Sequence, residues 1–209
     1  MIIRRVVVGM IETNCYILID EATGSAAVID PGFMTQALKN AIQSPEIKSV
    51  DYILLTHGHF DHIMGVYELK EMTGAKVVIH SNDKTCLESE RASLASQVFP
   101  GKQQALSCDV EVEEGSTINV GSLEVKVMHT PGHTPGCCCY IVGDAIFSGD
   151  TIFAGSIGRC DLPGGDYRTL LASLQSIKKT LQGDYRVLPG HGEETTLECE
   201  RKYNPYFRG

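Results

Sequence analysis

Three of the seven histidines in this chain lie within six residues, in the string THGHFDH. The string directly follows an apolar, β-branched run, Val50–Thr56, which is short enough for a buried strand. It therefore occupies a strand end and the loop into a helix, where side chains from several strands can converge. His57 and His59 are two positions apart, so in extended backbone they share a face and can grip one ion. Asp61 and His62 lie at the following turn, where they could serve a second ion.

Three further candidate ligands occupy equivalent places later in the chain: His133 in TPGHTP, Asp150 in FSGD and His191 in LPGH. Each lies just past a short apolar run and next to glycine. Five histidines and two carboxylates exceed what one ion requires, and these ligand types suit Zn²⁺, Fe²⁺ or Mn²⁺. Gathering them without a metal would leave buried charge unpaired. We therefore expect a metal site rather than a purely structural cluster.

Alternating and β-branched runs predict strands in both halves of the chain: Ile2–Val8, Asn14–Asp20, Ala26–Asp30, Val50–Thr56, Lys76–His80, Thr117–Val120, Leu123–Met128, Cys137–Val142, Ala145–Ser148 and Arg186–Leu188. Helical spacing and stop signals predict helices over Met34–Gln43, His62–Met72, Asn82–Glu90, Asp166–Leu181 and Glu194–Tyr203. Ser93–Ser107 is expected to be a mobile loop or a broken helix. Two β-rich sets, each followed by helices, predict an α/β protein whose two sheets pack face to face with helices outside, as one domain over residues 1–209.

Composition narrows the partners that the chain can have. With 18 basic and 26 acidic side chains the net charge is −8, which disfavours nucleic acid and anionic membranes. No apolar run approaches the ~20 residues of a membrane span, and the N-terminus lacks the features of a secretory signal. The eight cysteines include no C-x-x-C pair, so we expect reduced, mostly buried thiols. A cytoplasmic protein acting on a small molecule is expected, and no motif specifies its oligomeric state.

The motifs THGHFDH, HTPGHTPG, FSGD and LPGH, in this order, resemble the H-x-H-x-D-H signature and downstream ligands of the metallo-β-lactamase superfamily. The resemblance extends over nearly the whole chain, from AAVIDPG near the start. FAGSIGRCDLPGGD and the ending NPYF are similar to the short members of the glyoxalase II-like, or hydroxyacylglutathione hydrolase-like, branch. This resemblance implies a four-layer αββα sandwich. It also implies hydrolysis of a small thioester of the acylglutathione type, such as S-lactoylglutathione.

The resemblance also implies a division of the ligands between two divalent ions, most simply zinc, with iron or manganese as alternatives. It places one ion on His57, His59 and His133 and a second on Asp61, His62 and His191, with Asp150 as the bridge. Asp61 is also the implied catalytic residue. Two ions about 3.5–4 Å apart can share a hydroxide whose pKa falls to about 7, and this hydroxide would attack the carbonyl carbon. A thiolate then leaves without a strong general acid.

Departures from the family pattern leave other activities open. Eighteen residues follow His191, too few for the C-terminal helical domain that supplies much of the glutathione site in the long enzymes. A persulfide dioxygenase with one Fe²⁺ on His57, His133 and Asp150 is the main alternative. Antibiotic hydrolysis is disfavoured, because the best-known β-lactamase subclass has cysteine at the place of Asp150 and no histidine at that of His62. Two further alternatives are a nuclease of the superfamily, disfavoured by the short, acidic chain, and a non-catalytic metal-binding or partner-docking module, disfavoured by the intact ligand set.

The residues outside the ligand set that could belong to the site are interpreted individually. Arg159 falls where the family often has a basic residue near the substrate, and it could hold a substrate carboxylate by a forked hydrogen bond. Asp30, in AAVIDPG, is either a turn-forming residue or a hydrogen-bonding support for a ligand histidine. His80 is expected to be structural, and His129 to be structural or to support the site. Cys160 and the run Cys137-Cys138-Cys139 receive no role from any motif.

Overall fold

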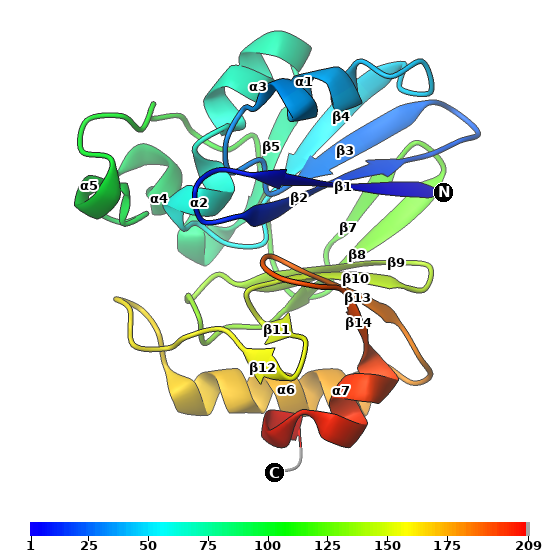
Figure 1. Ribbon diagram of the computed structural model, residues 1–209, viewed down its shortest axis with the longest axis vertical. Helices are drawn as coiled ribbons and strands as arrows, with labels where there is room; N and C mark the ends of the chain where they lie inside the picture. The colour runs from blue at the N-terminus through cyan, green and yellow to red at the C-terminus, as the bar shows by residue number, and fades with distance from the viewer. Residues whose placement is uncertain (208–209) are drawn as a thin grey trace.

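Two six-stranded β-sheets face each other in the computed structural model, which describes residues 1–207 (Figure 1). The first sheet follows the chain in order, from β1 (Ile2–Val8) through β2 (Thr13–Ile19), β3 (Ser25–Ile29), β4 (Ser49–Leu54) and β5 (Lys76–His80) to β6 (Val110–Val112). Its strands β1 to β3 are antiparallel, and β3 to β6 are parallel. Parallel neighbours place successive strand ends, and the loops that follow them, at one edge of the sheet.

The second sheet is mostly antiparallel and has the order β14-β13-β10-β9-β8-β7. Its strands are β7 (Thr117–Val120), β8 (Leu123–His129), β9 (Cys138–Val142), β10 (Ala145–Gly149), β13 (Arg186–Pro189) and β14 (Thr195–Thr196). Within it, β7–β8 and β9–β10 pair as antiparallel hairpins. Strands β10 and β13 run parallel, so the residues that follow both emerge at the same edge.

Helices cover the outer faces of both sheets (Figure 1). On the first sheet these are α1 (Gln36–Ile42) and α3 (Val66–Thr73), and on the second α6 (Tyr167–Thr180) and α7 (Leu197–Tyr203). The shorter elements are α2 (Phe60–Ile63), η1 (Ser81–Asp83), α4 (Thr85–Glu88), α5 (Ala95–Val98), β11 (Ile152–Phe153), β12 (Ser156–Ile157) and η2 (Pro205–Phe207). The predicted four-layer αββα sandwich is therefore confirmed. None of the helices in the described part of the chain combines the length and apolarity needed to cross a bilayer.

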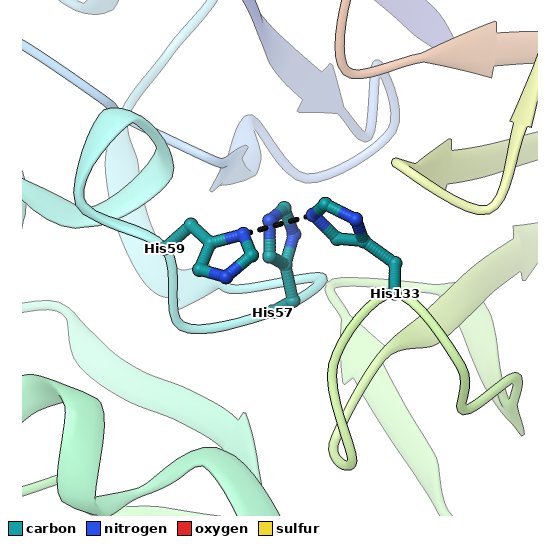
Figure 2. A group of neighbouring side chains, drawn as sticks. All are labelled: His57, His59 and His133. Carbon is teal, nitrogen blue, oxygen red and sulfur yellow. Dashed lines mark hydrogen bonds between the residues drawn. The ribbon is translucent and has the colours of Figure 1, made fainter. Parts of the chain in front are cut away.

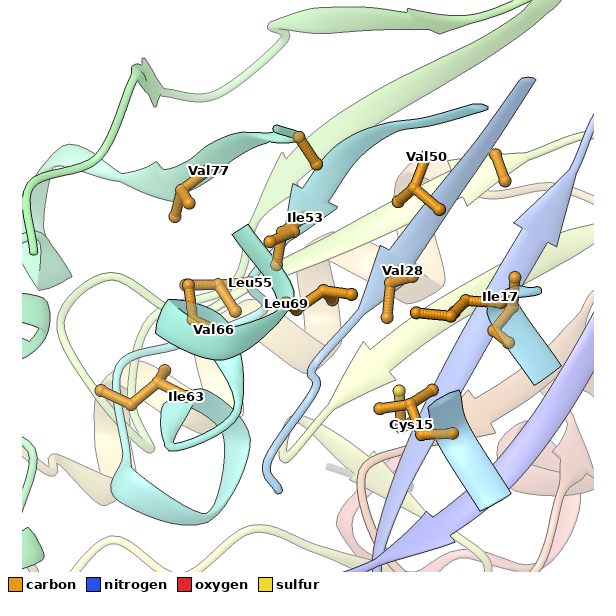
Figure 3. Packing of buried hydrophobic residues seen from close by; sticks show 14 of the residues in the cluster. Cys15, Ile17, Val28, Val50, Ile53, Leu55, Ile63, Val66, Leu69 and Val77 are labelled. Carbon is orange, nitrogen blue, oxygen red and sulfur yellow. The ribbon is translucent and has the colours of Figure 1, made fainter. Parts of the chain in front are cut away.

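Period-two alternation in the strands produces three separate apolar layers. In β2, Cys15 and Ile17 face the helices of the first sheet, whereas Tyr16 and Leu18 face the second sheet. Figure 3 shows the first of these layers, in which Leu69 of α3 packs over the strands. The layer between the sheets contains the largest side chains, including Tyr16 and Phe147, whose ring centroids lie 5.4 Å apart. Each strand therefore contributes to two layers at once, and this fixes its register.

The third layer lies between the second sheet and α6. The helical spacing of the apolar residues predicted over Asp166–Leu181 places Leu170, Leu174 and Ile177 on one face of α6, where all three are fully buried. Asp166 caps the helix by accepting a hydrogen bond from the backbone N–H of Thr169, at 2.7 Å. The cap satisfies one of the unpaired donors at the start of the helix.

The prediction of one helix over His62–Met72 is wrong. The helix is interrupted between α2 and α3, where Gly65 donates its N–H to the carbonyl of Pro31 at 2.9 Å. A Cβ at Gly65 would lie 2.4 Å from that same oxygen, so only glycine permits the approach. The interruption turns α2 away from α3 and fixes the positions of Asp61 and His62.

Other differences concern short elements. The helix predicted over Asn82–Glu90 is η1 followed by α4, and the uncertain stretch Ser93–Ser107 contains α5. Strands β6, β11, β12 and β14 were not predicted. All eight cysteines are unpaired, as expected, and burial raises the pKa of the Cys86 thiol to about 12. The prediction of one domain over residues 1–209 stays a prediction, and its last two residues lie outside those described.

The α6 layer allows a test of the packing. Leu174→Ala should lower the free energy of unfolding by about 2–5 kcal/mol, because it leaves a cavity in a fully buried layer. Ser176→Ala, on the exposed side of the same helix, should change it by less than about 0.5 kcal/mol. Urea unfolding followed by circular dichroism measures both. Equal losses in the two variants would contradict the assigned orientation of α6.

Candidate metal centre

Loops from both sheets bring all seven predicted ligands to one edge of the sandwich. His57 and His59 lie between β4 and α2, and Asp61 and His62 lie within α2. The remaining three follow strands of the second sheet: His133 after β8, Asp150 after β10 and His191 after β13. Six of the seven are buried, and His191 is partly exposed. Residues up to 134 positions apart in the chain thus face one another.

The first group consists of His57, His59 and His133 (Figure 2). One ring nitrogen of each lies within 4.8 Å of those of the other two. Figure 2 shows the His59 and His133 rings pointing toward each other from different sheets, with Nδ1 of His59 2.8 Å from Nε2 of His133. Three imidazoles converging in this way form a typical site for a zinc-like divalent ion.

The second group consists of Asp61, His62 and His191. Oδ2 of Asp61 lies 3.1 Å from Nε2 of His191 and 3.5 Å from Nε2 of His62. Asp150 faces both groups, since its Oδ2 is 3.5 Å from Nε2 of His133 and 3.7 Å from Nε2 of His191. This is the arrangement expected of two ions that share one carboxylate.

Three buried polar atoms of the cluster have no hydrogen-bond partner: Nε2 of His57, Nε2 of His62 and Oδ1 of Asp150. Buried polar atoms of a folded protein are almost always paired, so an unpaired group of this kind needs an explanation. All three atoms are metal-ligating types and all belong to the candidate ligand set. The residues therefore fit divalent ions bound among them.

The outward nitrogens of three ligand histidines are anchored by acceptors. Nδ1 of His62 donates to Oδ2 of Asp30 at 2.9 Å, and Nδ1 of His133 donates to the carbonyl of Arg159 at 2.7 Å. Nδ1 of His191 lies 3.2 Å from the carbonyl of Ile11. Such contacts fix the tautomer, so that Nε2 keeps its lone pair toward the cluster.

Asp30 therefore supports a ligand histidine, the second of the two roles considered for it. Its other contacts are to Thr56, whose N–H and Oγ1 donate to the carboxylate at 2.8 and 2.6 Å. Asp30 also has a left-handed φ of 51°, which non-glycine residues rarely adopt. The turn-forming and supporting roles are thus combined in one residue.

Burial and neighbouring charges shift the pKa values of the cluster histidines in opposite directions. Burial lowers the pKa of His57 well below its ordinary value, and burial with the neighbouring His133 lowers the pKa of His59 to about 4. Burial also opposes protonation of His62, but Asp61, Asp30 and Asp150 together raise its pKa well above the ordinary value. His57 and His59 therefore favour the neutral imidazole form, whereas carboxylates favour the protonated form of His62.

A cavity of about 510 Å³ opens over the cluster and contacts His59, Asp61, His133, Asp150 and His191. Its other walls are largely apolar: Ile11, Phe60, Leu94, Phe153, Ile157 and Leu162. A concave, mainly apolar site with a few convergent polar groups is the usual form of a small-molecule site.

Arg159 also lines the cavity, as its predicted role requires. Its guanidinium, however, already forms a forked pair with Asp161, with Nε–Oδ1 and Nη2–Oδ2 distances of 2.7 Å. Both side chains are mostly exposed. A substrate carboxylate would have to compete with Asp161 for this cation.

His80 and His129 lie apart from the cluster and stack on each other, with ring centroids 4.0 Å apart. His80 accepts a hydrogen bond from the N–H of Asn82, and His129 contacts the carbonyl of Pro135. Neither belongs to a metal-ligating group among residues 1–207. Sequence reasoning missed the cavity walls Ile11 and Leu94, which lie in unremarkable loop segments and carry no motif.

The sequence is similar to those of several known proteins. Residues 8–191 match the family model of the metallo-beta-lactamase superfamily. An uncharacterized protein of Aquifex aeolicus is 39% identical over 99% of this chain and 97% of its own length. The probable metallo-hydrolase YqgX of Bacillus subtilis is 36% identical, covering 99% and 97%. The hydroxyacylglutathione hydrolase GloC of Haemophilus influenzae is 32% identical, covering 98% and 97%.

Solved structures share the fold over the whole chain. BLEG-1, a B3 metallo-beta-lactamase, superposes with a TM-score of 0.92 at 32% identity and full coverage of both chains. TTHA1623 in a di-iron-bound form has a TM-score of 0.83 at 35% identity, covering 97% and 99%. ETHE1 from Myxococcus xanthus has a TM-score of 0.81 at 30% identity, covering 98% and 84%.

The unpaired buried atoms predict a large stabilisation by metal. Adding Zn²⁺ to chelator-treated protein at about 100 times its dissociation constant should raise the free energy of unfolding by about 2.7 kcal/mol per site. His57→Ala should lose much of this increment. His129→Ala, which changes a histidine outside the cluster, should keep it. Thermal unfolding with and without Zn²⁺ measures the increment, and equal increments in both variants would contradict the assigned ligands.

Proposed function

The chain belongs to the metallo-beta-lactamase superfamily of metal-dependent hydrolases, and we propose that its substrate is a small thioester of the acylglutathione type, such as S-lactoylglutathione. The observation that carries the proposal is the pair of ligand groups sharing Asp150 beneath the cavity. Similarity to a hydroxyacylglutathione hydrolase along nearly the full length of both chains supports it.

We propose two divalent ions, most simply zinc, held by the ligands named above. Similarity to a di-iron-bound structure keeps iron as an alternative, and the ligand types accept manganese as well. Such ions would lower the pKa of a water molecule and stabilise negative charge on a carbonyl oxygen.

The residues of the chain have separate tasks in this scheme. Asp61, the proposed catalytic residue, lies at the cavity, where its carboxylate also accepts a hydrogen bond from Thr13 at 3.4 Å. Although burial opposes its ionisation, His62 and His191 lower the pKa of Asp61. An ionised carboxylate at this position accepts a hydrogen bond from water and orients it toward the substrate.

The leaving group needs little help from the protein. An ordinary thiol has a pKa near 8.5, so a thiolate departs without protonation by a strong acid. Cys160 is not needed as a nucleophile, and burial raises the pKa of its thiol. The apolar walls, among them Phe60 and Phe153, would enclose the acyl group and exclude bulk water.

We also infer a cytoplasmic setting and a small-molecule substrate rather than nucleic acid. Eight unpaired cysteines suit a reducing compartment. A net charge of −8 would repel a phosphate backbone.

β-Lactam hydrolysis is the second candidate, because the BLEG-1 structure superposes over the complete chain. The persulfide dioxygenase alternative requires one iron on His57, His133 and Asp150. Asp150 lies close enough to both histidine groups to serve that arrangement too. The three activities differ in product, and the dioxygenase also differs in metal content, so one set of measurements separates them.

Protein purified without added metal should contain two divalent ions per chain and hydrolyse S-lactoylglutathione, detected as released thiol. His59→Ala should lower kcat/KM by at least about 100-fold, because losing a ligand should cost more than the 10–100-fold typical of changes behind the ligands. His129→Ala serves as the matched control and should retain activity.

Two results would overturn the proposed substrate class. One iron per chain with oxygen consumption on a persulfide would favour the dioxygenase. Faster turnover of a chromogenic cephalosporin than of any thioester would favour the β-lactamase.

Arg159 provides a test of how the substrate is held. Arg159→Ala should raise KM for S-lactoylglutathione by roughly two- to fivefold, the range expected for one exposed ion pair. Asp161→Asn, which frees the guanidinium, should lower KM. A thioester of an uncharged thiol should respond to neither change, and a similar response for both substrates would argue against carboxylate recognition.

A further inference from the structure

Asp83 is a buried carboxylate behind the first ligand group, and no motif marks it. We propose that Asp83 is a positioning residue that joins the two loops carrying His57, His59 and His133 and places a negative charge behind their ion. This inference rests on the proposed metal centre, and it does not depend on the substrate.

The contacts of Asp83 connect loops from both sheets. Its Oδ2 accepts hydrogen bonds from the N–H of Gly58 at 2.9 Å and from Oγ1 of Thr134 at 2.6 Å. Its Oδ1 accepts from the N–H of Gly136 at 2.7 Å. Gly58 lies between His57 and His59, and Thr134 follows His133, so one carboxylate holds the chain beside all three imidazoles.

Both glycines are required for this approach. A Cβ at Gly136 would lie 2.5 Å from Cγ of Asp83, and a Cβ at Gly58 would lie 2.4 Å from Cβ of Cys86. The backbone N–H groups therefore meet the carboxylate directly, with no side chain between them. The contact therefore depends on glycine at both positions, because any larger residue would push the two loops apart.

The charge of Asp83 is not balanced by a basic side chain. The residue is 1% exposed and forms no ion pair within residues 1–207. A buried charge without a counter-ion costs free energy unless hydrogen bonds or a nearby cation offset it. Three donors satisfy the hydrogen-bonding capacity of the Asp83 carboxylate. A nearby cation is the other means of offsetting its charge.

The carboxylates at this edge of the sandwich suggest where that cation lies. Four are buried there: Asp30, Asp61, Asp83 and Asp150. No lysine or arginine is among the buried residues of the described chain. Two divalent ions would supply positive charge that offsets these buried carboxylates. Since the first ligand group contains only imidazoles besides the shared Asp150, Asp83 would add negative charge on the side of that ion.

Asp83→Asn tests the charge while keeping the shape. The affinity for one of the two Zn²⁺ ions should fall roughly 10- to 100-fold, as for other residues that orient ligands. Competition with a chromophoric chelator measures both dissociation constants on the full chain. His133→Ala identifies which ion belongs to the first group, because it removes a ligand outright.

Asp20→Asn is the matched control. Asp20 is also a buried carboxylate with backbone and hydroxyl donors, from Ser122 and Thr23, but it lies at a turn outside the ligand loops. This variant should bind both ions as tightly as the unchanged protein. If Asp83→Asn lowers the melting temperature as Asp20→Asn does and leaves both affinities intact, Asp83 is merely structural and the proposal is wrong.

Two milder substitutions, both at Thr134, test the proposal if Asp83→Asn does not fold. Thr134→Val removes the hydroxyl donor and should lower the affinity for the same ion. Thr134→Ser keeps a hydroxyl and should retain that affinity. Equal affinities in these two variants would also overturn the proposal. A protein that binds two ions but hydrolyses no thioester would refute the proposed function and leave the inference on Asp83 standing.

Discussion

Hydrogen bonds between the two sheets at one edge of the sandwich are the contacts on which the site depends. Each joins a residue of one sheet to a backbone carbonyl just before a ligand in the other: Cys138 N–H to Thr56 at 2.9 Å, Tyr140 O–H to Leu55 at 3.0 Å, Asn14 N–H to Gly190 at 2.7 Å and Tyr16 O–H to Pro189 at 3.0 Å. The apolar layer behind them holds the sheets together. Ligands from separate halves of the chain therefore meet with a defined register.

Most of the fold could be predicted because the strands carry their own pattern of burial. Strands of five or more residues, such as β2 and β8, show apolar runs that period-two reasoning detects. The missed strands have two or three residues, as in β11 and β14, and are formed by pairing with a neighbour rather than by propensity. The break between α2 and α3 was missed for a similar reason. It depends on the carbonyl of Pro31, which lies far from Gly65 in sequence terms but beside it in the fold.

In the candidate site, too, the sequence predicts some residues and misses others. The convergence of its candidate ligands could be predicted because they are rare residue types in fixed local spacings, and because strand ends are where such residues meet. The residues that support them cannot be found like this. Asp83 resembles an ordinary turn aspartate, and its importance comes from Gly58 and Gly136, which lie 25 and 53 positions away. Ile11 contributes a backbone carbonyl, which any residue could supply.

The opposite pKa shifts in the cluster explain why a divalent ion suits it better than protons do. Burial lowers the pKa values of His57 and His59, whereas nearby carboxylates raise those of His62 and, against its own burial, His191. A proton on one imidazole occupies the lone pair that faces the cluster and disfavours protonation of the neighbouring rings. A divalent ion binds neutral imidazoles through those lone pairs and also neutralises the carboxylates. A bound divalent ion would thus suit both sets of histidines, and it would offset the buried carboxylate charge.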